Sequence, residues 1–231
     1  MVLAAGLGTR MRPLTETRPK PLIEAGRKTL LDHNLDQLAE SGITEAVVNV
    51  HYLPDQIIHH VAARRRPAVT ISDERDRLLD SGGGILKVLP FFGDAPFFTL
   101  NADTIWLDGP RRNLVRMQET FDPATMDVLL LVAPVVTTIG WGSRGDFLMD
   151  GAGRLRRPDR RDVAPFAYTG VGILKPESFT GKPEIFSLNR IFDEAAANGR
   201  LFGLRLDGVF MHVGTPQALA EAEHALDLYD R

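Results

Sequence analysis

The chain has 231 residues, 44% of them hydrophobic, which is enough for one large α/β domain with a sizeable core. Its 27 basic and 30 acidic residues leave a net charge of −3, too balanced for a general nucleic-acid-binding protein. It has no cysteine, which excludes disulfides and thiol chemistry, and no run of about 18 apolar residues that predicts a membrane span. No secretory signal is recognisable, so we expect a cytoplasmic protein that binds neither nucleic acid nor membrane.

The first two dozen residues carry the strongest functional signal. Residues 1–5 are apolar and predict a short buried strand that opens into a glycine loop. Gly6 and Gly8 let a ligand approach the main chain, and successive amides in such a turn form a concave anion site. One hydroxyl and three cations surround it, from Thr9, Arg10, Arg12 and Lys20. The pattern predicts a nucleotide-binding loop, although it matches neither the P-loop nor the three-glycine dinucleotide motif.

Strand and helix patterns alternate over the next fifty residues. Apolar spacing predicts helices over residues 29–41 and from Pro54 onward, and buried strands over residues 46–50 and 69–72. This alternation indicates a parallel sheet covered by helices on both faces. Ligands of such sheets bind outside the carboxyl ends of the strands, where the opening loop lies.

A run of three glycines, residues 82–84, precedes a short helix expected over residues 85–89. Glycines at this point would allow close approach of a flat ligand and leave backbone N–H groups free. A flexible turn with no ligand is the alternative.

An aromatic strand at residues 97–100 runs into Asn101 and Asp103. An aspartate at the carboxyl end of a central strand faces the ligand crevice, where it can hold Mg²⁺ together with substrate phosphates. The alternative for Asp103 is a helix cap or turn residue.

The second half of the chain is richer in strand signals. We expect a polar connector and helix over residues 107–120, then strands, a hairpin around residues 150–153 and a helix over residues 187–198. The strands are expected at residues 127–133, 145–149, 154–157, 166–174 and 201–206, with a final helix at residues 217–229. Together they predict a β-rich insertion over the crevice.

The opening motif, LAAGxGTRxRPLT at residues 3–15 followed by Pro-Lys-Pro at residues 19–21, resembles the signature of the sugar-1-phosphate nucleotidyltransferases. The resemblance implies a Rossmann-like three-layer α/β/α fold with a mostly parallel central sheet and a small β-rich sugar-binding insertion. It implies one nucleotidyltransferase domain over residues 1–231, with a nucleotide-binding half at 1–110, a sugar-binding half at 111–231 and no C-terminal β-helix domain.

The same resemblance implies the reaction, in which a nucleoside triphosphate and a sugar 1-phosphate give a nucleotide sugar and pyrophosphate with the help of Mg²⁺. The implied catalytic residues are Arg10, Lys20 and Asp103. The implied nucleotide-binding residues are Leu3, Ala4, Ala5, Gly6, Gly8, Thr9, Arg10, Asp80, Ser81, Gly82, Gly83 and Asn101. The implied sugar-binding residues are Gly145, Thr169, Gly170 and Phe210.

Two departures from the family pattern concern the reaction centre. Many members carry Glu-Lys-Pro after the hairpin, with the lysine on the sugar phosphate, and here the nearest equivalent is Arg157-Pro158. An arginine from residues 154–161 could serve instead. The second metal motif, normally aromatic-apolar-Asp-Val-Gly-Thr, has His212 in place of the carboxylate. His212 is either a metal ligand beside Asp103 or a hydrogen-bonded neighbour, since Mg²⁺ disfavours nitrogen.

Within the family, the chain is most similar to the bacterial N-acetylmuramate 1-phosphate uridylyltransferases of cell-wall peptidoglycan recycling, which make a UDP-sugar. Transferases for glucose 1-phosphate, mannose 1-phosphate or phosphocholine share the opening loop and are alternatives. A catalytically weakened nucleotide-sugar sensor or regulatory subunit is another, because both departures touch the reaction centre. We expect a monomer or a small homo-oligomer.

Overall fold

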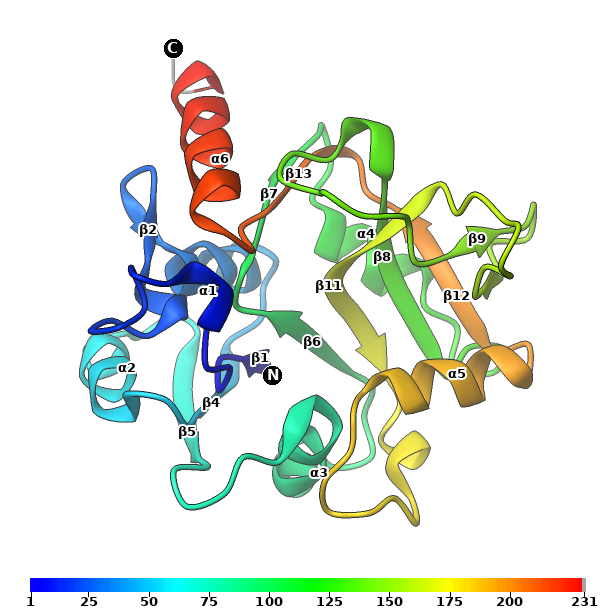
Figure 1. Ribbon diagram of the computed structural model, residues 1–231. Helices are drawn as coiled ribbons and strands as arrows, with labels where there is room; N and C mark the ends of the chain where they lie inside the picture. The colour runs from blue at the N-terminus through cyan, green and yellow to red at the C-terminus, as the bar shows by residue number, and fades with distance from the viewer. Residues whose placement is uncertain (230–231) are drawn as a thin grey trace.

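A computed structural model describes residues 1–229 of the chain (Figure 1). The strands of its central sheet are β1 Val2–Leu3, β4 Glu45–Val50, β5 Ala68–Asp73, β6 Phe97–Asn101, β8 Val128–Pro134, β11 Phe166–Leu174 and β12 Leu201–Arg205. They lie in the order β12-β8-β11-β6-β1-β4-β5. All neighbours in the sheet run parallel except β11, which is antiparallel to both β6 and β8. The expected mostly parallel sheet is confirmed.

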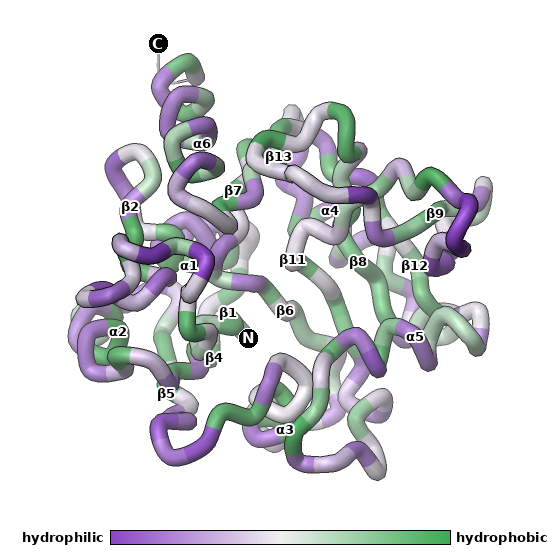
Figure 2. The backbone as a smooth tube through the Cα atoms, viewed as in Figure 1, coloured by the Kyte–Doolittle hydropathy of each residue, from purple (hydrophilic) through white to green (hydrophobic). Residues whose placement is uncertain are grey.

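Helices cover both faces of this sheet. The helices α1 Leu30–Glu40, α2 Pro54–Val61 and α4 Asn113–Thr120 share one core with one face, and α3 Asp80–Phe92 and α5 Asn189–Ala197 share another core with the opposite face. Strand β8 shows the reason, because Leu129 and Leu131 enter the first core and Leu130 and Val132 the second. Strand β8, like most of the central strands, has apolar residues on both of its faces (Figure 2). The three-layer α/β/α architecture is confirmed.

A third apolar cluster lies beside the main sheet. Here β7 Thr104–Asp108 pairs antiparallel with β13 Gly208–His212, and α6 Pro216–Tyr229 packs against the pair. Our expectation of a polar connector from residue 107 missed β7, whose Ile105 is buried in this cluster and whose Trp106 is buried in the first core.

Small elements complete the chain. The expected hairpin is present but short, with β9 Leu148–Met149 and β10 Leu155–Arg156. A second hairpin, β2 Glu24–Ala25 and β3 Lys28–Thr29, leads into α1, which begins after Thr29 because the Thr29 hydroxyl accepts a hydrogen bond from the Asp32 N–H. Among residues 1–229, no helix has the length and apolar character needed to cross a bilayer.

Candidate functional site

Two adjoining cavities lie where the chain leaves the carboxyl ends of the central parallel strands. The smaller has a volume of about 490 Å³ and the larger about 1230 Å³. Asn101, the last residue of β6, lines both. Polar residues from several strand ends therefore meet at one edge of the sheet, as expected for a doubly covered α/β sheet.

Most of the expected nucleotide residues line the smaller cavity. They are Leu3, Ala4, Ala5, Gly6, Asp80, Ser81 and Asn101, joined by Lys20 and Asp103. Arg10, in the short 3-10 helix η1 Thr9–Met11, lines the larger cavity instead. Gly8 and Thr9 line neither. Gly8 has a φ of +64°, and a Cβ there would lie 3.0 Å from Lys20 Cβ, so this glycine shapes the loop.

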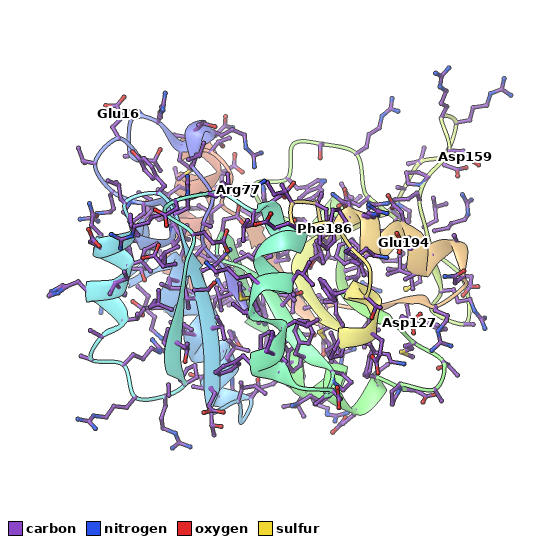
Figure 3. All side chains as sticks on the ribbon, turned by 90° about the horizontal axis from the view of Figure 1, so that it is seen from below. Glu16, Arg77, Asp127, Asp159, Phe186 and Glu194 are labelled. Atoms are coloured by element: carbon purple, nitrogen blue, oxygen red, sulfur yellow. The ribbon has the colours of Figure 1, made fainter. Side chains whose placement is uncertain are left out.

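The run of three glycines has a different role from the one we expected. Helix α3 begins at Asp80, not Ile85, so all three glycines lie within it. The N–H groups of Gly82 and Gly83 donate to the Phe186 carbonyl at 2.9 and 3.2 Å, so they are not free for a ligand. A Cβ on Gly82 would lie 2.4 Å from the Phe186 ring, which packs beside α3 (Figure 3). Here the glycines permit helix packing, and the preceding Leu78, Asp80 and Ser81 line the smaller cavity.

An ion pair lines the smaller cavity close to His212, which lines the larger one, and we call this place the junction of the two cavities. Lys20, from the 3-10 helix η2 Lys20–Leu22, donates to Oδ2 of Asp103 at 2.6 Å, and both side chains are largely buried. Burial acts to raise the pKa of Asp103, but the charge and the hydrogen bond of Lys20 outweigh it and hold that pKa below its usual value. Asp103 is therefore an ionised carboxylate at neutral pH.

His212 lies close to this pair at the end of β13. Its ring meets Trp141 edge-on, with ring centroids 5.3 Å apart, and a Cβ on Gly214 would lie 2.6 Å from its Nε2. Burial lowers the pKa of His212, and the opposing charges of Asp103 and Lys20 partly offset each other. Within the described chain the ring makes no hydrogen bond, so a neutral imidazole lines the larger cavity with its nitrogens uncommitted.

The donor set around Asp103 fits a magnesium ion that shares its shell with substrate. Among residues 1–229, no group of three His, Cys, Asp or Glu side chains converges as a metal cage. Asp103 offers one carboxylate and His212 at most one nitrogen. Mg²⁺ is commonly held by one or two carboxylates together with substrate phosphates, so this sparse set is compatible with it.

The expected sugar residues divide into two groups. Thr169 and Gly170, where β11 departs from regular pairing with β8, line the larger cavity. Gly170 has a φ of +86°, and a Cβ there would lie 2.7 Å from Thr104 Oγ1. Phe210 is buried in the core and Gly145 lies behind the cavity wall, so neither lines the cavity.

Arg157 and Asp146 line the larger cavity and were not among the assigned site residues. Arg157 donates to Asp193 at 2.8 Å and to Asn189 at 2.7 Å, and its guanidinium lies 4.4 Å from the centre of the Phe147 ring. These contacts fix the arginine before any ligand arrives. Of the arginines at residues 154–161, Arg157 is the one that lines the cavity.

Asp146 is the second of these. Its Oδ2 accepts the Tyr168 N–H at 2.8 Å, and burial raises the pKa of Asp146 despite this bond and the nearby charge of Arg157. The sequence contained a signal for it. In a strand of the kind expected at residues 145–149, successive side chains alternate between faces, so Asp146 is expected to face away from Phe147.

A buried polar chain supports the smaller cavity from behind, and our sequence analysis missed it. Asn49, a cavity residue on β4, accepts the Ala4 N–H at 2.8 Å and donates to Glu74 at 2.8 Å. Glu74 is buried and makes no ion pair within the described residues. Burial raises its pKa above the usual value, against the lowering effect of the Asn49 hydrogen bond.

Comparison with known proteins gives a consistent answer. The sequence pattern of the nucleotidyl transferase family matches residues 1–142. An N-acetylmuramate alpha-1-phosphate uridylyltransferase from Caulobacter vibrioides is 43% identical over 98% of this chain and 96% of its own, and one from Neisseria meningitidis is 31% identical over 96% of each chain. A mannose-1-phosphate guanyltransferase from Aspergillus oryzae is 29% identical over 94% of this chain but 61% of its own. A solved UDP-glucose pyrophosphorylase complexed with UDP-glucose superposes with a TM-score of 0.78 at 18% identity, over 100% of this chain and 98% of its own.

The burial of Glu74 generates a prediction about stability and pH. Because its pKa is raised in the folded protein, its contribution to stability is fully present below the unfolded pKa, about 4.5, and is lost as pH rises through the folded pKa. Glu74→Gln stays neutral throughout. We therefore expect the Tm of the wild type minus the Tm of Glu74→Gln to fall as pH rises from about 4.5 to 8.

The measurement is thermal unfolding across that range, with the exposed Glu45→Gln as the control for removing a surface carboxyl. If the Tm of the wild type minus the Tm of Glu74→Gln stays constant or grows as pH rises, the pKa of Glu74 is not raised in the folded protein.

Proposed function

The chain belongs to the nucleotidyl transferase family, among the sugar-1-phosphate nucleotidyltransferases, and we propose that it joins UTP to N-acetylmuramate 1-phosphate with release of pyrophosphate. The observation that carries the proposal is the Lys20–Asp103 pair, which lies where a cavity built from the opening loop meets a second, larger cavity. The uridylyl and muramate assignments rest on the relative that is 43% identical over nearly all of the chain.

We assign the nucleoside to the smaller cavity and the sugar to the larger one, following the two halves of the chain. The backbone of Leu3–Gly6, together with Asp80 and Ser81, lines a largely apolar slot suited to a base and ribose. Arg10 lines the larger cavity near the junction, where it would meet the triphosphate. The volume of about 490 Å³ is in the range of small-molecule sites.

The reaction is an in-line displacement. An oxygen of the sugar 1-phosphate forms a bond to the α-phosphorus of UTP, and the bond from that phosphorus to the bridging oxygen of pyrophosphate breaks. Both reactants are anionic, so positioning and charge neutralisation are the main tasks. Lys20 would hold phosphate oxygens between donor and acceptor, and Arg10 would stabilise the charge that develops on pyrophosphate.

Asp103 would hold Mg²⁺ through a carboxylate oxygen, and a bound Mg²⁺ acts as a Lewis acid on phosphate oxygens. The Lys20 ammonium bonds one carboxylate oxygen of Asp103, Oδ2, and its remaining N–H groups would contact the substrate phosphates. His212 would contact a phosphate oxygen or a water molecule of the metal shell.

On the acceptor side, Arg157 takes the place of the missing lysine as the anchor for the sugar phosphate. The contacts to Asp193 and Asn189 hold the guanidinium in one orientation, which reduces the entropy lost on binding. Asp146, with one oxygen held by Tyr168, has its other oxygen available to accept a hydrogen bond from a sugar hydroxyl or amide.

Pyrophosphate release tests the proposed function directly. We expect it only when UTP, N-acetylmuramate 1-phosphate and Mg²⁺ are all present, with kcat/KM for UTP at least tenfold above that for GTP, a difference of about 1.4 kcal/mol. Glucose 1-phosphate, mannose 1-phosphate and phosphocholine serve as competing acceptors. A higher kcat/KM for GTP than for UTP would overturn the assignment of UTP as donor. Binding of these ligands without turnover of any of them would favour a nucleotide-sugar sensor instead.

The metal assignment predicts an order among variants at the junction. Asp103→Ala should lower kcat/KM by roughly 10²-fold or more, the scale of one charge-stabilising group, and His212→Ala should cost less. His212→Asp should bind Mg²⁺ more tightly without substrate, because a second carboxylate adds negative charge and an oxygen donor. Calorimetric Mg²⁺ titration and the metal dependence of turnover provide the measurements. Equal damage from His212→Ala and Asp103→Ala, with no rescue by Mn²⁺, would give His212 an essential role instead.

The acceptor assignment predicts a selective loss of sugar-phosphate binding. Arg157→Ala should raise KM for the sugar 1-phosphate by roughly tenfold to a hundredfold and leave KM for UTP nearly unchanged. The KM of Arg157→Lys for the sugar 1-phosphate should lie between those of the wild type and Arg157→Ala. Lysine keeps the charge but lacks the planar guanidinium that Asp193 and Asn189 hold. The adjacent Arg156→Ala is the matched control, since Arg156 is exposed and pairs with Asp162 at 2.6 Å. An equal rise in both KM values would place Arg157 outside the acceptor site.

A further inference from the structure

The most exposed large apolar side chains of the described protein gather in two places. Val136 and Val163 are 92% and 88% exposed, and Tyr229 and Leu228 are 61% and 56% exposed. The first two line one cleft, and the last two end helix α6. Paired apolar groups left in water at two distinct sites indicate surfaces that are covered by something else.

The cleft around Val136 and Val163, which we call the basic cleft, has a volume of about 580 Å³. Prolines and valines line it, together with four arginines: Arg144, Arg160, Arg161 and Arg205. All four are exposed, and within residues 1–229 none forms an ion pair with a carboxylate. Asp162, also in the cleft, is already paired with Arg156 at 2.6 Å. In a chain with a net charge of −3, this cleft is a local concentration of positive charge.

The end of α6 has the opposite charge. The acidic tip, Glu223, Asp227, Leu228 and Tyr229, is exposed, and the sequence of α6 contains no lysine or arginine. Figure 1 shows this end of α6 projecting from the rest of the molecule. A helix end with carboxylates beside apolar side chains complements a cleft with arginines beside valines.

The acidic tip cannot reach the basic cleft of its own chain. The larger cavity lies between them, with Glu221, His224 and Leu228 of α6 on one wall and Asp146 on another. Gly145, the neighbour of Asp146, belongs to the basic cleft behind that wall. A contact between the two surfaces must therefore join different molecules.

We propose that the acidic tip of one molecule docks in the basic cleft of a second copy of this chain. The apolar side chains leave water together, and the carboxylates of Glu223 and Asp227 gain partners among the four arginines. The acidic tip and the basic cleft are different surfaces. If each of two molecules docks its tip in the cleft of the other, the result is a closed two-fold dimer; if not, the molecules join head to tail in a chain. The contact leaves Lys20, Asp103 and Arg157 untouched, although Leu228 of the acidic tip also lines the larger cavity.

Sedimentation velocity tests the proposal with charge-reversed variants. We expect the wild type to associate at concentrations up to about 0.1 mM in low salt, in the range of weak transient contacts, and to dissociate as the Debye length falls to about 3 Å near 1 M salt. Arg160→Glu/Arg161→Glu and Glu223→Lys/Asp227→Lys should each weaken association at least tenfold. An equimolar mixture of the two variants should associate again, because each supplies the surface that the other has lost.

Arg65→Glu/Arg66→Glu is the matched control, since it makes the same charge change on exposed arginines elsewhere and should leave association intact. Turnover of dilute protein should be unchanged in all variants. A wild type that stays at the monomer mass of 25.5 kDa throughout would overturn the proposal, as would association that survives both reversals or a mixture that does not recover it. Binding of the basic cleft to anionic vesicles by a strictly monomeric protein would identify a lipid surface as the occupant and equally overturn it.

Discussion

The ion pair between Lys20 and Asp103 is the constraint on which the site depends. It joins residues 83 positions apart at 2.6 Å, one from the opening loop and one from the turn after β6. Each charge would be costly to bury alone, and together they neutralise one another in a largely buried place. The pair thus keeps a carboxylate ionised at the centre of a site that must hold two anions. In the proposed reaction these two charges would contact metal and phosphate with little further loss of hydration, because both side chains are already largely buried.

The sheet explains why these groups meet. Strands β1, β4 and β6 are parallel neighbours, so the opening loop, Asn49 and Asn101 emerge at the same edge. The antiparallel strand β11 then brings Thr169 and Gly170 against the end of β6 from the second half of the chain. The two cavities are therefore products of one sheet, and the change of strand direction marks the step from the smaller cavity to the larger.

Sequence reasoning succeeded where a local pattern determines the outcome. Helix and strand periodicity predicted the layers, and the apolar strand before Asp103 predicted its place at a strand end, where it lines the smaller cavity. It failed where orientation depends on distant partners. Phe210 faces the core because β13 pairs with β7, a strand that the polar residues around it concealed. Asn49 and Glu74 look like isolated polar residues in the sequence, and only the folded chain shows that they support Ala4 together.

The glycines of α3 have a consequence for how the site is assembled. Three glycines weaken a helix by roughly 3 kcal/mol relative to alanine, at about 1 kcal/mol each. The start of α3 is instead held by the Phe186 carbonyl, and by Ser81, whose hydroxyl accepts the Leu188 N–H at 2.9 Å. The wall that carries Asp80 and Ser81 is thus held in place by residues that follow it by about a hundred positions. Residues 1–110 contain almost every side chain of the nucleotide cavity, yet as an isolated fragment they would lack the support that gives this wall its shape.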